Sequence, residues 1–235
     1  MKIFEIKDIW YFAIAAVVCY LIGCFNFAVL IAHFKKKNIR DMGSGNPGTM
    51  NMTRSLGLKF GAINFFCDVF KGGFPVLAGY LIFKGYVFEG TEIAVSDFAR
   101  YFFGLFVIIG HIFPVTMKFK GGKGIASTMG IFMFGLPCET WWYIFIVDGF
   151  LIGILFYIIY TEWGSMGSLI GITVPTIFQA IIFVKRYSAL LLNGWCVAML
   201  VVLLAINLLS WTAHHKNIFR LLAGEEHRTV VRKYK

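Results

Sequence analysis

The stretch WYFAIAAVVCYLIGCFNFAVLIA, residues 10–32, is almost entirely apolar, and the basic segment HFKKKNIR, residues 33–40, follows it directly. A helix needs about 20 apolar residues to cross the hydrocarbon core of a bilayer, and this stretch is long enough. Clustered Lys and Arg next to a span hold that end on the cytoplasmic side. The stretch therefore predicts a transmembrane helix that ends in the cytoplasm.

The composition of the chain extends this prediction to the whole molecule. Of its 235 residues, 59% are hydrophobic and 14% are charged, and the mean hydropathy is +0.76. Soluble domains carry about 25% charged residues, so the composition excludes that class. The net charge of +10 lies mainly at the ends of apolar runs, which favours membrane orientation and lipid headgroups over nucleic acid. Since no long polar linker divides the chain, we predict one all-α transmembrane domain over residues 1–235.

Six further apolar runs predict spans. They cover about residues 59–83, 98–115, 125–136, 141–160, 165–184 and 189–210. The run at 125–136 is short and ends at Pro137, and the sides of all later loops depend on its crossing. We therefore predict a bundle of seven transmembrane helices.

The distribution of basic residues orients this bundle. Seven spans, with the first ending inside, place the N-terminus outside and the C-terminus in the cytoplasm. Most of the 22 Lys and Arg residues then lie on the cytoplasmic side, as expected for short loops. The exceptions are Lys2, Lys7, Lys84, Arg100, Lys185 and Arg186 outside, and Lys71 within the bilayer.

Three polar segments interrupt the apolar chain on the predicted cytoplasmic side, at residues 43–54, 111–123 and 214–226. The first two are rich in glycine, which lets backbone N–H groups point together at one anion, and a following helix start adds its positive dipole end. Arg54 and Lys123 add full positive charges. We expect the three segments to form one site for more than one phosphate group.

Several polar side chains have both a chemical and a structural interpretation. His111 and His214 are suited to act as general bases, and equally to hydrogen-bond neighbouring loops. Ser44 has no obvious activating base beside it, so we expect a phosphate ligand or a helix cap rather than a nucleophile. Asp68 and Lys71 are three residues apart on one helical face, and we predict a structural pair.

Other features predict no special chemistry on their own. For the basic residues at 35–37, 118 and 120 we favour a role in orientation. The sequence KGGKG is not a nucleotide P-loop, because no Ser or Thr follows the lysine. The cysteines form no metal-binding pattern, so we expect small buried residues and no metal or other cofactor. They are Cys19, Cys24, Cys67, Cys138 and Cys196.

Taken together, the polar segments resemble the motifs of the PlsY family of bacterial glycerol-3-phosphate acyltransferases. The matches are residues 44–54 for SGNxGxxNxxR, 68–72 for DxxKG, 110–127 for GHxFPxxxxFxGGKGxAT and 214–226 for HxxNIxRLxxGxE. The motifs recur in order across nearly the whole chain. The chain departs from them at Ser127, which replaces a Thr, and at Thr49 and Met50, which replace Ala and Thr; the latter change has no interpretation.

The resemblance implies an integral enzyme of the bacterial cell membrane with seven spans. It implies transfer of an acyl chain from acyl phosphate to sn-glycerol 3-phosphate, which gives lysophosphatidic acid and inorganic phosphate and begins phospholipid synthesis. The implied partner is the soluble acyl-carrier-protein phosphate acyltransferase that makes the acyl phosphate.

The resemblance also implies roles for individual residues. Catalytic roles fall to His214, Lys123 and Arg54. The implied substrate-binding residues are Ser44, Asn46, Asn51, His111, Gly121, Gly122, Gly124 and Asn217. The implied supporting residues are Asp68, Lys71, Arg220 and Glu226.

The chemistry fits this assignment. Acyl phosphate is a mixed anhydride, so phosphate leaves readily and no acyl-enzyme is required. The His-x4-Asp motif of the other large acyltransferase class is absent from the sequence. We therefore expect direct attack by the glycerol hydroxyl, with the proton passing to a substrate phosphate or to His214. The alternative is a membrane carrier for organic phosphates or other anions. Carriers usually bind substrate near the midplane between repeats, whereas the polar motifs here gather at one face and no repeat is evident.

Overall fold

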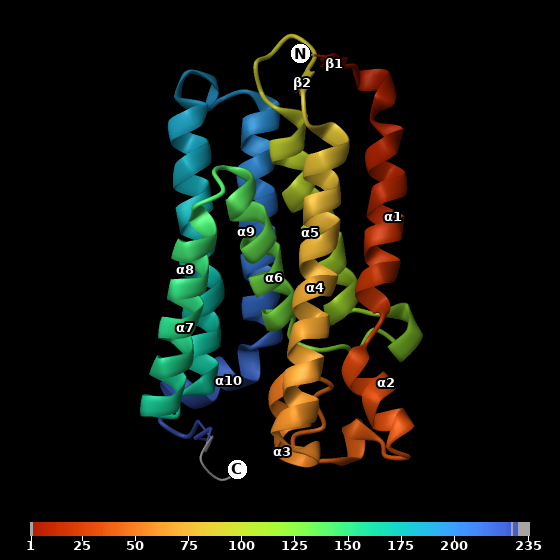
Figure 1. Ribbon diagram of the computed structural model, residues 1–235, viewed down its shortest axis with the longest axis vertical. Coiled ribbons are helices and arrows are strands. Elements are labelled where there is room, and N and C mark those ends of the chain that lie inside the picture. Colours follow the sequence, from red (N-terminus) through yellow and green to blue (C-terminus); the bar gives the residue numbers. More distant parts are fainter. Residues whose placement is uncertain (1, 227, 230–235) are drawn as a thin grey trace.

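Long apolar helices, lying side by side, give the molecule its shape (Figure 1). The computed structural model describes residues 2–226, 228 and 229. Six spans in this part of the chain are long and apolar enough to cross a membrane. The first consists of α1 (Trp10–Cys24) and α2 (Phe27–Phe34), and the others are α4 (Leu58–Phe83), α5 (Val95–Ile112), α7 (Tyr143–Thr161), α8 (Gly164–Arg186) and α9 (Gly194–Ala213). The predicted fourth span is the shorter helix α6 (Ile125–Gly135), which continues as the 3-10 turn Leu136–Cys138.

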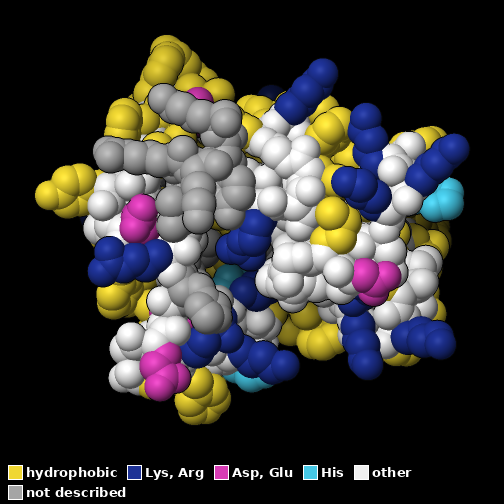
Figure 2. Space-filling model, turned by 90° about the horizontal axis from the view of Figure 1, so that it is seen from below, with side chains coloured by type: hydrophobic (Ala, Val, Ile, Leu, Met, Phe, Trp, Pro, Cys, Tyr) yellow, Lys and Arg dark blue, Asp and Glu magenta, His cyan; other side chains and the backbone are white. Residues whose placement is uncertain are grey.

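Short elements close the two ends of the bundle. At one end, strands β1 (Lys2–Phe4) and β2 (Tyr86–Phe88) pair in parallel, with Lys2 opposite Tyr86. The prediction of helices alone missed them, because strands of three residues leave no periodicity in the sequence. At the other end lie α3 (Thr49–Leu56) and α10 (His215–Leu222). Seen from this second end, Lys and Arg side chains project from much of the surface (Figure 2).

The first predicted span is broken in the middle. Helix α1 ends before Phe25, and Asn26 starts α2 by accepting a hydrogen bond from the backbone N–H of Val29 at 2.9 Å. The amide of Asn26 also donates to the carbonyl of Pro47 at 3.2 Å. Unpaired backbone carbonyls at a helix break need partners, and Phe25 O accepts from Lys71 Nζ at 2.9 Å. The break thus ties the first span to the first polar segment.

Helix α5 lies at the centre of the bundle. It packs against α1, α4, α6 and α9. Of its most apolar 18-residue stretch, 67% is buried, whereas the corresponding share for α7, at the periphery, is 11%. Helices α4 and α6 also lie in close contact, because a Cβ atom on Gly72 would lie only 2.0 Å from the carbonyl oxygen of Ser127. Small residues allow this approach of two backbones in a membrane bundle. The approach fixes the N-terminal turn of α6.

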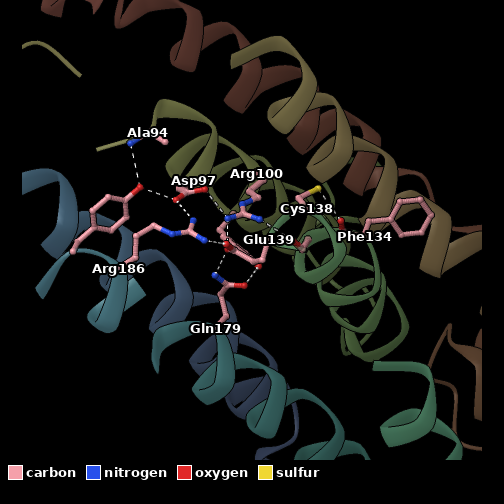
Figure 3. A network of polar contacts seen from close by, with 11 residues as sticks. Ala94, Asp97, Arg100, Phe134, Cys138, Glu139, Gln179 and Arg186 are labelled. Atoms are coloured by element: carbon pink, nitrogen blue, oxygen red, sulfur yellow. Dashed lines mark hydrogen bonds and ion pairs between the residues drawn. The ribbon is translucent and has the colours of Figure 1, made fainter. Parts of the chain in front are cut away.

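A cluster of ion pairs, buried except at Arg186, joins α5, α6 and α8 at the end that carries the strands (Figure 3). Arg100 donates to Asp97 Oδ1 at 2.7 Å and to Glu139, which follows the 3-10 turn after α6. Arg186, in the last turn of α8, donates to Asp97 Oδ2 at 2.7 Å and to Glu139. Gln179 donates to Glu139 at 2.7 Å. Two positive and two negative charges balance; Arg100, Asp97 and Glu139 lie away from water, where charges must be paired, and Arg186 lies at the exposed edge.

Candidate active site

The second and third polar segments meet through Lys123 and Asn217. Lys123 Nζ donates a hydrogen bond to Asn217 Oδ1, although the two residues come from the loop before α6 and from α10. The amide of Asn217 donates to Ser165 Oγ at 2.9 Å and to Glu226 Oε1 at 2.7 Å. Arg220 Nε donates to Glu226 Oε2 at 2.8 Å. The predicted convergence of these two segments is therefore confirmed.

Lys123 holds its proton weakly. Burial is the largest cause that lowers the pKa of Lys123; Glu226 opposes it, the positive charges of Arg220 and Arg54 add to it, and the net pKa is about 8. Because the charge of Arg54 acts on the pKa of Lys123, the first polar segment contributes to the electrostatics of the other two. An excess of positive charge at a partly buried position favours an anionic ligand, which would restore the full charge of Lys123.

His214 lies between α9 and α10 as an uncharged imidazole. Its Nδ1 atom is 2.8 Å from the carbonyl oxygen of Ser210. Since a carbonyl oxygen only accepts, Nδ1 carries the hydrogen and Nε2 keeps its lone pair. Burial lowers the pKa of His214 to about 4, and the charge of Lys123 acts in the same direction. At neutral pH, Nε2 of His214 can therefore accept a proton or a hydrogen bond.

Glu226 is the acceptor around which the third segment is arranged. Burial raises its pKa, but hydrogen bonds from Ser165, Asn217 and Arg220 outweigh this effect and lower the pKa overall. Glu226 is thus held as a carboxylate. Ser165, in the first turn of α8, donates to Glu226 and accepts from Asn217. Sequence reasoning missed Ser165, because a lone Ser after a Gly at the start of a span carries no distinguishing signal.

The glycine-rich loop before α6 serves a different purpose from the predicted one. The N–H of Gly121 donates to Ile112 O at 2.9 Å, and that of Gly122 donates to His111 O at 3.1 Å. These two N–H groups therefore cap the C-terminal end of α5 instead of turning toward an anion. The first turn of α6, which begins after Gly124, leaves N–H groups without intrahelical partners, and these are suited to a phosphate.

Beneath this loop lies a buried polar triad. Lys71 Nζ contacts Phe25 O at 2.9 Å, Asp68 Oδ1 at 2.9 Å and His111 Nδ1 at 2.8 Å. An ammonium group has three donors, so those of Lys71 are fully used. His111 Nδ1 accepts, and its Nε2 atom faces Gly122, where a Cβ would lie 2.4 Å away. The geometry favours the predicted supporting role for Asp68 and Lys71, and it favours the same role for His111.

The first polar segment is held by Asn51. The buried side chain of Asn51 accepts from the N–H of Ser44 at 2.8 Å and donates to Met42 O at 2.9 Å and Ile39 O at 3.2 Å. These bonds favour support of the loop over contact with substrate. Within the described chain, the exposed guanidinium of Arg54 and the hydroxyl of Ser44 have no hydrogen-bond or ion-pair partner. Both groups are therefore available to an anion.

Two details of the first segment differ from the sequence prediction. The second span does not begin directly after the glycine-rich loop, because the separate helix α3 lies between them. The helix N-terminus next to this loop is therefore that of α3, which starts after Gly48. Asn46 is half-buried, with its side-chain nitrogen beside Gly48.

Comparison with known proteins places the chain among membrane acyltransferases. A family model described as glycerol-3-phosphate acyltransferase matches residues 13–224. The glycerol-3-phosphate acyltransferase of Mycoplasmopsis pulmonis is 34% identical over 214 residues, which cover 88% of this chain and 88% of the relative. The enzyme of the same name from Aquifex aeolicus is 32% identical over 212 residues, which cover 90% of this chain and 96% of the relative.

Two solved structures share this fold. Both are crystal structures of PlsY, an integral membrane glycerol 3-phosphate acyltransferase, and each covers 93% of this chain and 95% of its own. The glycerol 3-phosphate form has a TM-score of 0.70 at 30% identity. The lysophosphatidic acid form has a TM-score of 0.69 at 29% identity.

Proposed function

This chain belongs to the glycerol-3-phosphate acyltransferase family, and we propose that it transfers an acyl chain to glycerol 3-phosphate to give lysophosphatidic acid. The observation that carries the proposal is the junction of Lys123 with Asn217, which brings a lysine of lowered pKa beside the neutral His214. A cationic site with a nearby proton acceptor suits a phosphorylated alcohol that must lose its hydroxyl proton.

The donor in our proposal is acyl phosphate. The glycerol hydroxyl oxygen attacks the acyl carbonyl carbon, the bond from that carbon to the phosphate oxygen breaks, and inorganic phosphate leaves with the electron pair. The hydroxyl proton passes to Nε2 of His214 or to a substrate phosphate. Lys123, Arg54 and the N–H groups at the start of α6 offset the repulsion between two phosphates.

We propose the remaining roles from the same geometry. Ser44 binds phosphate beside Arg54, and Asn217 orients Lys123. The proposed supporting residues are Asn51, Asp68, Lys71, His111, Gly121, Gly122, Arg220 and Glu226.

The proposed setting is a single domain that crosses the bacterial cell membrane seven times. Support comes from α6, which with the 3-10 turn after it leads from Lys123 to Glu139 in the ion-pair cluster at the end that carries the strands. The site then faces the cytoplasm, where a soluble acyl-carrier-protein phosphate acyltransferase supplies the donor. An impermeant thiol reagent added to intact cells should label Glu89→Cys and spare Lys36→Cys in a cysteine-free background. Labelling of Lys36→Cys from outside would show that the orientation is the reverse of the proposed one.

The test of function uses the purified protein with palmitoyl phosphate and glycerol 3-phosphate. We expect lysophosphatidic acid and inorganic phosphate to form in equal amounts. Palmitoyl-CoA is the control donor and should give no product. Failure to form lysophosphatidic acid from palmitoyl phosphate would overturn the proposed donor, and failure with both donors would overturn the proposed reaction.

The affinity for glycerol 3-phosphate should depend on pH through Lys123. Its pKa of about 8 means that the substrate-free enzyme loses this charge as the pH rises past that value. The substrate phosphate, with a second pKa of about 6, is doubly charged throughout this range. KM for glycerol 3-phosphate should therefore rise between about pH 7.5 and 9. In Lys123→Arg, which stays charged, KM should be constant over the same range. A constant KM in the wild type would contradict the role of this charge.

The close contact at Gly122 predicts a loss of activity on a minimal change. In Gly122→Ala the new Cβ atom would lie 2.4 Å from His111 Nε2, so either the loop that leads to Lys123 or the His111 ring, which Lys71 holds, must move. A displacement of about 1 Å costs about 100-fold in rate, and we expect a loss of this size in kcat/KM. The matched control is Gly149→Ala on α7, where a Cβ meets nothing within 4 Å. Equal activity of the two variants would argue against the contact.

A further inference from the structure

A strongly basic surface lies beside the candidate site. We call it the basic rim, and it consists of Lys35, Lys36, Lys37, Arg40, Lys59, Lys118 and Lys120, all exposed. These residues come from the end of α2, the turn that follows it, the first turn of α4 and the loop before α6. Asp41 is the only acidic residue in these segments, and the amide of Asn38 donates to it at 2.8 Å. Lys and Arg dominate this part of the end view (Figure 2).

Direct contacts join the segments of the basic rim into one surface. Lys35 Nζ lies 4.7 Å from the ring centroid of Phe60, next to Lys59 on α4. Arg40 donates a hydrogen bond to the backbone carbonyl of Lys120. The charges therefore act together on whatever lies against this surface.

Large apolar side chains stand exposed among these charges. Phe34 is 75% exposed, Leu58 58% and Phe119 59%. Facing water, such side chains would be unfavourable. At the membrane interface they enter the acyl-chain region, while neighbouring Lys and Arg extend toward the headgroups. This mixture favours a lipid surface over a soluble acidic protein as the partner.

The tip of the loop before α6, at Lys118 and Phe119, has a strained backbone. Lys118 and Phe119 have φ angles of 53° and 59°, in the left-handed region that residues with side chains rarely adopt. Gly121 follows two residues after Phe119, with its N–H bound to Ile112 O. A partner that holds this tip would lie close to the loop that leads to Lys123.

We propose that the basic rim binds the headgroups of anionic phospholipids in the cytoplasmic leaflet. The proposal rests on the orientation given under the proposed function, but it does not depend on the acyl transfer reaction. Each Lys or Arg near an anionic membrane surface strengthens binding by roughly fivefold. Together with the anchoring of Phe119, the bound headgroups hold the glycine-rich loop before α6 at headgroup depth.

The test measures lipid binding directly and requires no catalysis. The purified full-length protein is titrated with phosphatidylglycerol or phosphatidylcholine, and bound lipid is counted by native mass spectrometry. The test variant is Lys36→Gln/Lys118→Gln/Lys120→Gln. The matched control is Lys2→Gln/Lys7→Gln/Lys84→Gln, which removes three exposed lysines at the opposite end of the bundle. Because all six side chains are exposed, both variants should unfold at the wild-type temperature.

We expect the affinity for phosphatidylglycerol to fall at least about tenfold in the test variant and to stay at the wild-type value in the control. Binding of phosphatidylcholine should be the same in all three proteins. Equal affinity for phosphatidylglycerol in all three, or an equal loss in both variants, would overturn the proposal. Displacement of phosphatidylglycerol from the wild type by millimolar inorganic phosphate would also overturn it, because the rim would then be a site for free phosphate.

Discussion

Lys123→Ala is expected to lower kcat/KM for acyl transfer by about 10²–10³-fold, which is the usual cost of removing one group that stabilises developing charge. The side chain lies partly buried at the junction of two polar segments, where its charge acts in surroundings that screen it less than water does. Among the residues that the structure describes, its side chain makes one hydrogen bond, to Asn217, so the bundle should remain intact. The measurement is steady-state kinetics on purified protein, with the unfolding temperature recorded alongside.

The control for this prediction is Lys84→Ala. Lys84 is an exposed lysine at the end of α4 that lies far from the site (Figure 1), and its removal should leave kcat/KM unchanged. If Lys123→Ala keeps full activity, or if Lys84→Ala loses as much, the assignment of Lys123 fails. A large drop in unfolding temperature for Lys123→Ala would show a structural role instead.

Arg100→Met should destabilise the protein by about 3–5 kcal/mol, the usual cost of removing one partner from a buried ion pair. Arg100 is fully buried and bonds to both Asp97 and Glu139. Met fills a similar volume but leaves two carboxylates with Arg186 as their remaining cation. The measurement is thermal unfolding in detergent, and kcat at a temperature where both proteins are folded should stay near the wild-type value.

Lys7→Met provides the comparison for a surface pair. Lys7 Nζ lies 2.8 Å from Glu5, and the two side chains are 72% and 46% exposed, so water and salt screen this pair. The variant should unfold at the wild-type temperature. A similar loss in both variants, or none in Arg100→Met, would contradict the structural importance of the buried cluster.

The spans could be predicted from the sequence because hydropathy is a local property. The predicted run at 59–83 became α4 (Leu58–Phe83), and the short run before Pro137 became α6. The break at Asn26 could not be found in this way, because it depends on Pro47 and Lys71, far away in the chain. The ion-pair cluster was missed for the same reason, since Arg100 and Arg186 look like ordinary charges at span ends.

In the candidate site, too, some features could be predicted from the sequence and others could not. The charges of Lys123 and Arg54, and the meeting of the second and third polar segments, could be anticipated from residue types and from membrane orientation. The directions of N–H groups could not, because glycine permits many backbone conformations. Gly121 and Gly122 therefore proved to cap α5, and Ser165 was found only through its contacts with Asn217 and Glu226.

The buried cluster that joins α5, α6 and α8 also bears on how a lipid substrate enters. Paired charges fasten these helices at one end, whereas at the other end α10 meets α8 through neutral, part-buried hydrogen bonds such as that from Asn217 to Ser165. Local opening occurs where stabilising contacts are sparse. The helices should therefore separate more easily at the end that carries α3 and α10 than at the end that carries the strands. A long acyl chain can then reach Lys123 laterally from the bilayer. The closed end of the bundle keeps water from crossing it.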